Sequence, residues 1–594
     1  MRLALSGSAE MVRLAWRHSR AKILAALVLT LLAGAAWPLL ALALKAATGA
    51  VSAHDDRTAV LAGIGIGLGA IGVLMLQHFA YFPYTEIAES AVISLEAELM
   101  ALAGGSARIG HHERPQYADR IAVLQQELSQ LPDGFVGLFN TISLAVSMGV
   151  TAFLLATVNP WLLLLPLAAW PPVYAGRIAQ RITDSAREES AAATRQSRHL
   201  FRLATSAASA KELRVSRLQD EIAERYAQRW DEAGRVLRRA QRKAAAATAA
   251  GQAVFAAAYL ASILFVLRQA VADQRPIADV VLTIILVAQL NQQVNTGLTL
   301  LRQLQRTAQG LARLRWLREL VAAEEPPPGT VPLPAVLSSG ITFHDVAFAY
   351  PGTGTRVLAG VDLTLPAGST VAVVGENGAG KSTLVKLLCR FYDATEGTIT
   401  LDGVDLRDHP LDHWRQRIAA GFQDFVRFEL LARQTVGVGD LPSLDDESAV
   451  RAALDRARSY DVVERLEQGL STPLGKSYRE GAELSGGQWQ KLALGRAMMR
   501  EHPLLLVLDE PTSALDAQAE HTLFERYAAN ARRVARESGA VTVLVTHRFS
   551  TVRTADLIVV VGDSGIIETG DHRSLVAAGG LYAELHALQA AAYR

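Results

Sequence analysis

The sequence predicts two joined fold classes: an α-helical transmembrane bundle with long cytosolic helical arms, followed by an α/β domain. Residues 1–300 contain six apolar runs, and a helix of about 20 residues crosses a hydrocarbon core of about 30 Å. Beyond a proline-rich stretch, short β-rich runs alternate with helical stretches, which is typical of a mainly parallel sheet with crossover helices. Half of the 594 residues are hydrophobic, in agreement with a part that lies in lipid.

Six spans are expected from these apolar runs. They lie at approximately Ile23–Leu44, Val60–Phe82, Phe135–Val158, Leu162–Tyr174, Ala247–Leu267 and Ile277–Leu298. The fourth is short and contains Pro166, Pro171 and Pro172. A cleaved signal peptide is not expected, because the first run exceeds the usual apolar region of such a peptide and five more runs follow it.

Arginine positions predict the orientation. Arginine is dense before the first span, between residues 177 and 243, and between residues 302 and 318, which places both termini in the cytoplasm. We therefore expect a multi-pass protein of a bacterial cytoplasmic membrane, in contact with the lipid bilayer. The N-terminal stretch "MVRLAWRHSRAK" fits either a short helix on the inner leaflet or a solvated basic tail.

Two long segments, between spans two and three and between spans four and five, read as mostly polar helix. A helical pair with arms of about 30 residues would reach about 45 Å into the cytosol. Such arms are expected to contact a cytosolic domain.

That domain begins after "EEPPPGTVPLP", residues Glu324 to Pro334, because these prolines cannot continue a helix. The predicted organisation is a transmembrane domain at 1–322, a linker at 323–338 and a second domain at 339–580. The runs "STVAVV", "LLLVLD" and "VTVLVT" predict strands of its sheet.

A phosphate-binding loop is expected at "GENGAGKST", since it joins the first of these strands to a helix. Its backbone amides would surround phosphate, Lys381 would neutralise the outer phosphates, and Ser382 would offer a hydroxyl to Mg²⁺. The loop comprises Gly375, Glu376, Asn377, Gly378, Ala379, Gly380, Lys381, Ser382 and Thr383.

Two carboxylates end the apolar run "LLLVLDE", where strand ends carry ligand chemistry. Asp509 is expected to hold the metal and its hydration shell. Glu510 is expected to polarise an attacking water as a general base. His547, at the end of "VTVLVTH", is similarly placed to reach a γ-phosphate.

Charge and cysteine content exclude several classes of function. The formal net charge of +1 does not support nucleic-acid binding. The single cysteine, Cys389, excludes an internal disulfide framework and a site with several thiolates, and its apolar surroundings "TLVKLLCRF" predict core packing.

The motifs "GENGAGKST", "LSGGQ", "LLLVLDE", "SALD" and "VTH" occur in the order seen in nucleotide-binding domains of ABC transporters. Six spans followed by one such domain resemble an exporter half-transporter, with an ATPase domain that includes a helical subdomain. The resemblance implies ATP and Mg²⁺ as ligands, and hydrolysis of ATP to ADP and phosphate.

The resemblance also assigns roles to single residues. Tyr350 in "VAFAYPG" resembles the aromatic residue that stacks on adenine, and Gln423 in "GFQDF" resembles the glutamine that contacts Mg²⁺ and the membrane domain. Asp516 in "SALD" resembles a contact to the opposite subunit. The signature consists of Ser485, Gly486, Gly487 and Gln488.

In this family the signature faces the phosphate loop of a second chain, so a homodimer with two composite ATP sites is expected. Short helices at the arm tips contact the nucleotide-binding domains in such exporters. "HHERPQYADR", with Pro115 suited to a first helical turn, and the segment from Lys211 to Val215 resemble them.

The cargo is expected to be hydrophobic or amphipathic. The segments around the nucleotide-binding motifs resemble those of exporters of lantibiotics and other modified antimicrobial peptides, which favours peptide export. Drug or lipid export and an ATP-gated regulatory channel are alternatives. In the sixth span, Gln289, Gln292, Gln293 and Thr296 share one face, and Asn291 and Asn295 another. These polar residues indicate either a wet cavity or hydrogen bonds between helices.

Overall fold

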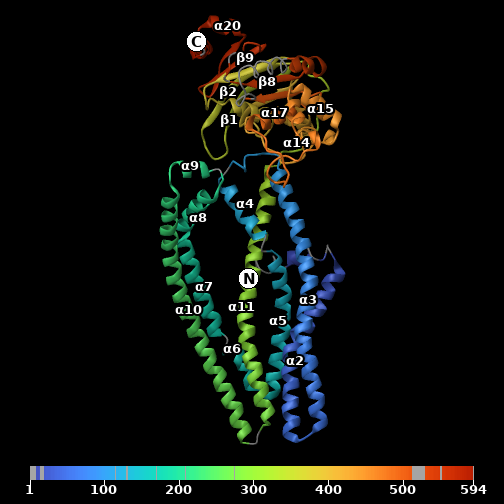
Figure 1. The fold of residues 1–594 in the computed structure, drawn as a ribbon, viewed down its shortest axis with the longest axis vertical. Helices are drawn as coiled ribbons and strands as arrows, with labels where there is room; N and C mark the ends of the chain where they lie inside the picture. Colours follow the sequence, from blue (N-terminus) through green and yellow to red (C-terminus); the bar gives the residue numbers. More distant parts are fainter. Residues whose placement is uncertain are drawn as a thin grey trace. The chain divides into compact units, whose positions relative to one another are not determined.

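The structure is a computed structural model. It describes residues 9–592 apart from 14–15, 17–18, 114, 129–130, 169, 208, 273–274, 511–528, 547 and 549–551. The chain forms two compact units. The membrane unit consists of Met1–Gly104 and Asp119–Glu319, and the nucleotide unit consists of Gly105–Ala118 and Leu320–Arg594. Residues 105–118 thus belong to the nucleotide unit, although helices of the membrane unit precede and follow them (Figure 1).

Long helices build the membrane unit. They are α2 (Arg20–Ala53), α3 (Asp56–Gly104), α4 (Pro115–Leu128), α5 (Leu131–Val158), η1 (Pro160–Leu164), α6 (Leu165–Ala168), α7 (Trp170–Glu189), α8 (Ala191–Thr205), α9 (Ala210–Val215), α10 (Gln219–Val271) and α11 (Ile277–Glu324). Local caps fix several ends. Ser19 accepts a hydrogen bond from the amide of Lys22 at the start of α2, and Asn159 accepts one from the amide of Trp161 in η1.

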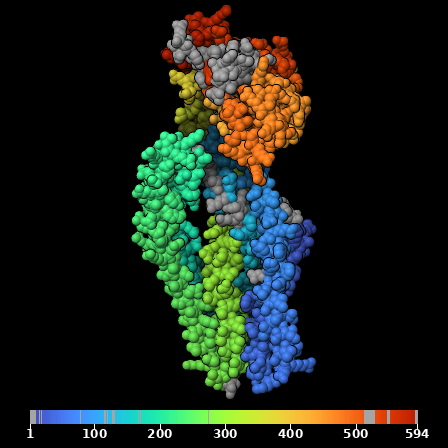
Figure 2. All heavy atoms as spheres, viewed as in Figure 1, coloured from blue at the N-terminus to red at the C-terminus, as the bar shows by residue number. Residues whose placement is uncertain are grey.

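These helices form two groups. Helices α2, α3 and α5 pack together, and α10 packs along α7 and α8 (Figure 1). Helix α11 joins the groups through hydrogen bonds to residues of both α5 and α10. On the face drawn in Figure 2, the unit is hollowed between the green α8–α10 arm and the other helices.

Five helices among the described residues are long and apolar enough to cross a membrane: α2, α3, α5, α10 and α11. They contain five of the six predicted spans. The predicted fourth span, Leu162–Tyr174, is divided between η1, α6 and α7. Pro171 and Pro172 lie in the first turn of α7, where the missing amide hydrogens cost no helical hydrogen bond. The count of six spans stays a prediction.

The polar face of α11 contacts another helix. Gln293 is only 5% exposed, and its Nε2 donates to Ser147 Oγ at 2.8 Å and to Thr151 Oγ1 at 3.1 Å, both on α5. Asn295, on a different face, accepts a hydrogen bond from Gln252 on α10 at 3.2 Å. For Gln293 the structure therefore favours hydrogen bonding between helices over a wet cavity.

A buried charge at the start of α11 is also paired. Asp279 is 3% exposed, and Lys45 on α2 lies 2.7 Å from its Oδ1. Arg275 lies 3.8 Å from its Oδ2. Paired in this way, the carboxylate avoids the penalty of an isolated buried charge.

The predicted arms are helical. Helices α7 and α8 run along α10, and the short α9 spans Ala210–Val215, where the sequence predicted a short helix at a tip. Pro115 is the first residue of α4, as expected from its fixed φ angle. Of the N-terminal stretch, residues 11–13 are helical, and residues 20–22 belong to α2.

The nucleotide unit contains two sheets in the described part of the chain. Its strands are β1 (Gly340–Ala349), β2 (Arg356–Pro366), β3 (Thr370–Gly375), β4 (Glu396–Leu401), β5 (Val404–Asp405), β6 (Ile418–Gly421), β7 (Leu505–Asp509), β8 (Val541–Val545), β9 (Leu557–Gly562) and β10 (Gly565–Gly570). One sheet has the order β2-β1-β4-β5 and is antiparallel; the other has the order β10-β9-β3-β8-β7-β6. In the second sheet all neighbours are parallel except β9 and β10.

Helices flank these sheets. They are α12 (Lys381–Leu388), η2 (Leu406–Asp408), α13 (Leu411–Gln416), α14 (Ala432–Gly437), η3 (Leu441–Ser443), α15 (Glu447–Arg456), α16 (Tyr460–Glu464), η4 (Gly469–Ser471), α17 (Gly486–Ala497), α20 (His572–Ala578) and α21 (Leu581–Ala592). The three predicted strands correspond to β3, β7 and β8, which confirms the mainly parallel sheet. Helices α14 to α17 pack around an apolar cluster to which β6, β7 and β8 also contribute residues, so the expected helical subdomain rests on one face of the sheet.

Cys389 follows α12 and is 2% exposed in the main core, so the expectation of core packing is confirmed. Burial raises the pKa of its thiol to about 12. Helix α11 ends at Glu324, just before the prolines at 326–328, which cannot continue a helix.

The contact between α5 and α11 yields a stability prediction. Gln293→Leu removes the donor to Ser147 and Thr151, and we expect it to lower the free energy of unfolding by about 1 kcal/mol. Thermal unfolding in detergent would measure this loss. Gln292→Leu, an exposed position on the same helix, is the matched control. Equal melting temperatures for the two variants would show that the α5 contact does not stabilise the unit.

Candidate functional site

A cleft of about 660 Å³ lies at the carboxyl edge of the parallel sheet in the nucleotide unit. Strands β3, β8 and β7 are direct neighbours, so the residues that end them meet at one edge. The described residues lining the cleft are Tyr350, Val357, Asn377, Gly378, Gly380, Lys381, Ser382, Thr383, Gln423, Asp509, Glu510 and Val545. The sheet thus collects residues from distant parts of the sequence.

The glycine-rich loop after β3 has the backbone that phosphate binding requires. Gly375 has φ +150°, and a Cβ there would lie 2.1 Å from the carbonyl oxygen of Val561. Gly380 has φ +107° and precedes α12, whose first residue is Lys381. Only glycine fits both positions without strain, and the loop brings the amino end of a helix to the cleft.

Lys381 is held over this loop. Its Nζ donates to the carbonyl oxygens of Gly375 at 2.9 Å and Glu376 at 2.8 Å. Burial lowers the pKa of the ammonium group, whereas Glu510 and Asp509 raise it. The lysine therefore supplies a positive charge that is partly withdrawn from water, which strengthens its attraction for phosphate.

Asp509 ends β7 and is 9% exposed. Burial, followed by the neighbouring charge of Glu510, raises the pKa of its carboxyl to about 6; Lys381 acts in the opposite direction. A divalent cation would relieve this crowding of negative charge. The cleft also offers Ser382 and Gln423, so the oxygen donors present fit Mg²⁺, which prefers hard oxygen ligands.

Glu510 lies directly after Asp509 with φ +45°, an uncommon angle for a residue with a side chain. Its amide donates to the carbonyl oxygen of Val545 at 2.9 Å, which holds the turn against β8. Gln423 Nε2 donates to Glu510 Oε2 at 2.8 Å. The predicted base and the predicted metal-contacting glutamine are thus in direct contact, and the strained turn fixes the carboxylate at the cleft.

Tyr350 also lines the cleft. Its hydroxyl lies 3.0 Å from Thr383 Oγ1, in the first turn of α12. Lys386 Nζ lies 5.0 Å from the centre of its ring, and the ring of Tyr392 meets it edge to face with centroids 5.4 Å apart. These contacts fix the plane of the aromatic ring beside the phosphate loop.

The signature lies elsewhere in the unit. Ser485 is the N-cap of α17: its Oγ accepts from the amide of Gln488 at 3.3 Å, and Gln488 Oε1 accepts from the amide of Ser485 at 2.8 Å. This reciprocal pair is a capping box. Gly486 and Gly487 form the first turn of the helix, and a Cβ on Gly486 would meet open space. The described residues that line the cleft include none of the four signature residues.

Two other predicted positions, His547 and Asp516, lie outside the described residues. Of the remaining loop residues, Asn377 and Thr383 line the cleft. Glu376 contributes its carbonyl oxygen to Lys381, and Ala379 packs against the main core.

Residues 105–118 contact the phosphate-loop helix α12 and the segment after it, and this contact was not predicted in detail. Lys386 Nζ lies 2.7 Å from Glu113 Oε1, and the hydroxyl of Tyr392 donates to Glu113 Oε2 at 2.5 Å. Glu113 therefore touches both side chains that flank the ring of Tyr350. The pairing joins positions more than 270 residues apart, and no local sequence signal identifies it.

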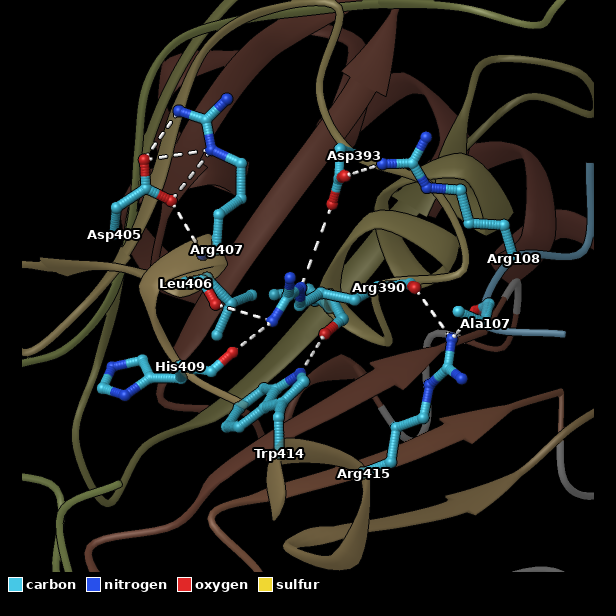
Figure 3. A network of polar contacts seen from close by, with 11 residues as sticks. Ala107, Arg108, Arg390, Asp393, Asp405, Leu406, Arg407, His409, Trp414 and Arg415 are labelled. Carbon is cyan, nitrogen blue, oxygen red and sulfur yellow. Dashed lines mark hydrogen bonds and ion pairs between the residues drawn. The ribbon is translucent and has the colours of Figure 1, made fainter. Parts of the chain in front are cut away.

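A second part of the same contact is shown in Figure 3. Arg108 pairs with Asp393, and Arg415 donates to the carbonyl oxygens of Ala107 and Arg390. Arg390 is 5% exposed and donates to the carbonyl oxygens of Leu406 and His409 at 2.9 Å each. The network fastens residues 105–118 to the chain just after α12.

Comparisons with known families agree with this geometry. Residues 358–513 match the model of the ABC transporter family, and residues 23–294 match the model of the ABC transporter transmembrane region. Among solved structures, a bacterial Atm1-family ABC exporter with ATP bound aligns with a TM-score of 0.75. The alignment covers 96% of this chain and 99% of that one at 23% identity, and it shows the exporter fold.

Curated relatives carry the name ATP-dependent lipid A-core flippase. The protein from Chromohalobacter salexigens is 43% identical over 258 residues, which are 43% of this chain and 42% of the relative. The protein from Alcanivorax borkumensis is 37% identical over 284 residues, or 48% of this chain and 46% of the relative. The chain thus spans less than half the length of these relatives. Their names do not support the expected likeness to lantibiotic exporters.

The two family matches together cover well over half of the chain, in the order membrane region and then nucleotide region. The chain therefore belongs to the ABC transporters and has the domain arrangement of an exporter half-transporter.

Proposed function

We propose that this protein is an ATP-driven exporter that hydrolyses ATP in its nucleotide unit and moves an amphipathic cargo across a bacterial cytoplasmic membrane. One observation carries the proposal: a single cleft joins the phosphate loop with Asp509 and with the Gln423–Glu510 contact. This arrangement belongs to a chain whose other unit has five helices, among those described, that are suited to lipid.

The polar residues at the centre of the cleft have separate roles in hydrolysis under this proposal. The amides of the phosphate loop and Lys381 hold the β- and γ-phosphates, and Tyr350 stacks on adenine. Ser382, Gln423 and Asp509 would hold Mg²⁺, which would supply positive charge opposite the transferred phosphoryl group. Glu510 would accept a proton from a water molecule while the oxygen of that water bonds to the γ-phosphorus. The bond between the γ-phosphorus and the oxygen of the β-phosphate would break, and ADP would leave. His547 is proposed as a further contact to the γ-phosphate.

Two chains are proposed to form two composite sites. In one chain the signature does not line the cleft, but its helix presents Gly486 with open space above it. A helix start of this kind is suited to an anion. The signature of each chain would therefore face the ATP held by the other. ATP binding would draw the two nucleotide units together, and hydrolysis would release them.

A lipid is the proposed cargo. The curated relatives are named for lipid flipping, and the membrane unit exposes many large apolar side chains along its helices. A peptide was the first expectation from motif style, and lipid replaces it here because the relatives carry lipid names.

The assignment of Glu510 predicts a hydrolysis defect. Glu510→Gln keeps the size of the side chain and an oxygen that can accept from Gln423, but removes the basic carboxylate. We expect ATP to bind and the turnover rate to fall by about 10²- to 10⁴-fold. ATPase assays and nucleotide retention on the purified protein measure both effects. Glu467→Gln, an exposed position on the same unit, is the control, and wild-type turnover by Glu510→Gln would rule out this base.

The pKa of Asp509 predicts a pH dependence. The proton and Mg²⁺ compete for the same carboxylate, whose raised pKa is about 6. Most of it is ionised at pH 7 and most is protonated at pH 5, so we expect the affinity for Mg·ATP to fall about tenfold between these values. The same titration with ATP in EDTA reports the protonation of ATP itself. An identical pH dependence with and without Mg²⁺ would contradict the metal role.

Mixed dimers test the composite sites. We combine a Lys381→Ala chain with a Ser485→Arg chain, select mixed dimers with two tags, and place Glu510→Gln in both chains. Composite sites put both lesions at one site, so about one ATP per dimer should stay bound; sites within one chain should retain nearly none. Homodimers of each mutant give the baseline amount of retained ATP. Folded mixed dimers that retain no more ATP than these homodimers would exclude the composite arrangement.

A further inference from the structure

Four side chains of the nucleotide unit form a closed ring of contacts beside the cleft: Tyr350, Lys386, Glu113 and Tyr392. Lys386 Nζ lies over the ring of Tyr350, 5.0 Å from its centre, and 2.7 Å from Glu113 Oε1. The hydroxyl of Tyr392 donates to Glu113 Oε2 at 2.5 Å, and the ring of Tyr392 meets that of Tyr350 with centroids 5.4 Å apart. The two oxygens of one carboxylate thus hold the two side chains that contact the Tyr350 ring.

Glu113 keeps the ammonium group of Lys386 at this ring. A lysine side chain is flexible, and an ammonium group without a partner would turn toward water. Burial acts to raise the pKa of the Glu113 carboxyl, but hydrogen bonds from Lys386 and Tyr392 outweigh it and lower the pKa. For Lys386, burial acts to lower the pKa of the ammonium group, but the hydrogen bond to Glu113 and nearby negative charge raise it overall. Both groups are therefore charged at neutral pH.

The backbone of residues 105–118 also packs against this group of side chains. A Cβ on Gly110 would lie 3.0 Å from Tyr392 Cε1, which is closer than a side chain normally approaches. Tyr392 is only 5% exposed. Its ring is therefore held by Gly110 on the ring carbons and by Glu113 on the hydroxyl, so the ring cannot turn without moving this segment.

Tyr350 connects these contacts with the cleft. Its side chain lines the cleft, and its hydroxyl lies 3.0 Å from Thr383 Oγ1 in the phosphate-loop helix. Phe348, near the end of β1, meets the ring of Tyr350 edge to face with centroids 5.0 Å apart. A base that stacks on Tyr350 would meet a ring whose plane is already fixed, so less conformational freedom is lost on binding.

We propose that Glu113 and Lys386 are positioning residues for the base of the bound nucleotide: they fix the plane of Tyr350 and raise the affinity for ATP through that ring. The interaction of a lysine with an aromatic face is large enough to change an affinity several-fold. The phosphates are assigned to other groups, Lys381 and the loop amides, so the effect concerns the base. The inference rests on the proposed function, because it takes Tyr350 as the residue on which adenine stacks.

Equilibrium binding to the full-length protein in detergent tests the proposal. The ligands are ATP in EDTA, which is not hydrolysed, and tripolyphosphate, which has the phosphates but no base. Lys386→Met and Glu113→Gln should each weaken ATP binding by about fivefold and tripolyphosphate binding by less than about twofold. Lys386→Arg keeps a cation over the ring and should bind ATP within about twofold of the wild type.

Tripolyphosphate also reports whether the phosphate loop is folded in each variant. Equal losses for ATP and tripolyphosphate would overturn the proposal, because Lys386 and Glu113 would then act on the phosphates or on the fold of the unit. A loss for Lys386→Arg as large as that for Lys386→Met would overturn it as well, because the cation would not be the group that matters.

Arg108→Gln is the matched control. Arg108 belongs to the same segment as Glu113, but it pairs with Asp393 (Figure 3). The variant therefore removes one attachment of the segment and leaves Glu113 and Lys386 in place, and it should bind ATP as the wild type does. A loss equal to that of Glu113→Gln would overturn the proposal, because general attachment of the segment would then account for the effect.

Combination with Tyr350→Leu tests the route of the effect. Tyr350→Leu alone should weaken ATP binding and spare tripolyphosphate. In that background Lys386→Met should weaken ATP binding by less than about a further twofold, since two changes that act through one ring are not additive. A full additional loss of about fivefold would show that Lys386 acts independently of Tyr350 and would overturn the proposal.

The proposed function fails separately. Its failure would be the absence of ATP hydrolysis, or a Tyr350→Leu variant that binds ATP as tightly as the wild type. If Tyr350→Leu loses affinity for ATP while Lys386→Met and Glu113→Gln do not, stacking on Tyr350 stays in place and only the positioning role is removed.

Discussion

Parallel pairing of β3, β8 and β7 is the constraint on which the nucleotide unit depends. Strands that run in one direction end at one edge, so the phosphate loop, Asp509 and Val545 meet there, although more than a hundred residues separate the loop from Asp509. Strand β8 holds the end of β7 in place. Asp509 pairs with Val545, and the carbonyl oxygen of Val545 accepts a hydrogen bond from the amide of Glu510. The cleft is a consequence of strand order.

The membrane unit obeys a different constraint, since each polar group in lipid needs a partner within the protein. Gln293 finds Ser147 and Thr151, and Asp279 finds Lys45. Residues 105–118 belong to the nucleotide unit, although they lie in the sequence between helices of the membrane unit. Within the nucleotide unit, Glu113 contacts Lys386 and Tyr392, the side chains beside Tyr350. Movement of this segment and the setting of that ring are therefore linked by direct contacts.

The sequence was sufficient where a local pattern determines structure. The β-rich runs, the glycine loop and the prolines at 326–328 predicted β3, β7, β8, the cleft and the end of α11. The sequence was insufficient where a contact joins residues that lie far apart in the chain. The contact of Glu113 with Lys386 has no local signature, and the two readings of Gln293 could be separated only once α5 was placed beside α11. In the fourth predicted span the prolines predicted an interruption, and that stretch of the chain is shared by η1, α6 and α7. From the sequence, arginine positions served only as a guide to orientation. That Arg177 and Arg302 line one cavity of the membrane unit is known only once the helices are placed.

The capping box at the start of α17 also affects how easily a bound anion is released. The first amides of a helix are the donors that an approaching anion would use, and here Ser485 Oγ already occupies the amide of Gln488. An incoming phosphate therefore gains fewer new hydrogen bonds than at an uncapped helix, while the helix start needs no rearrangement to remain stable after the phosphate leaves. A capped helix start of this kind favours short-lived over long-lived binding of an anion.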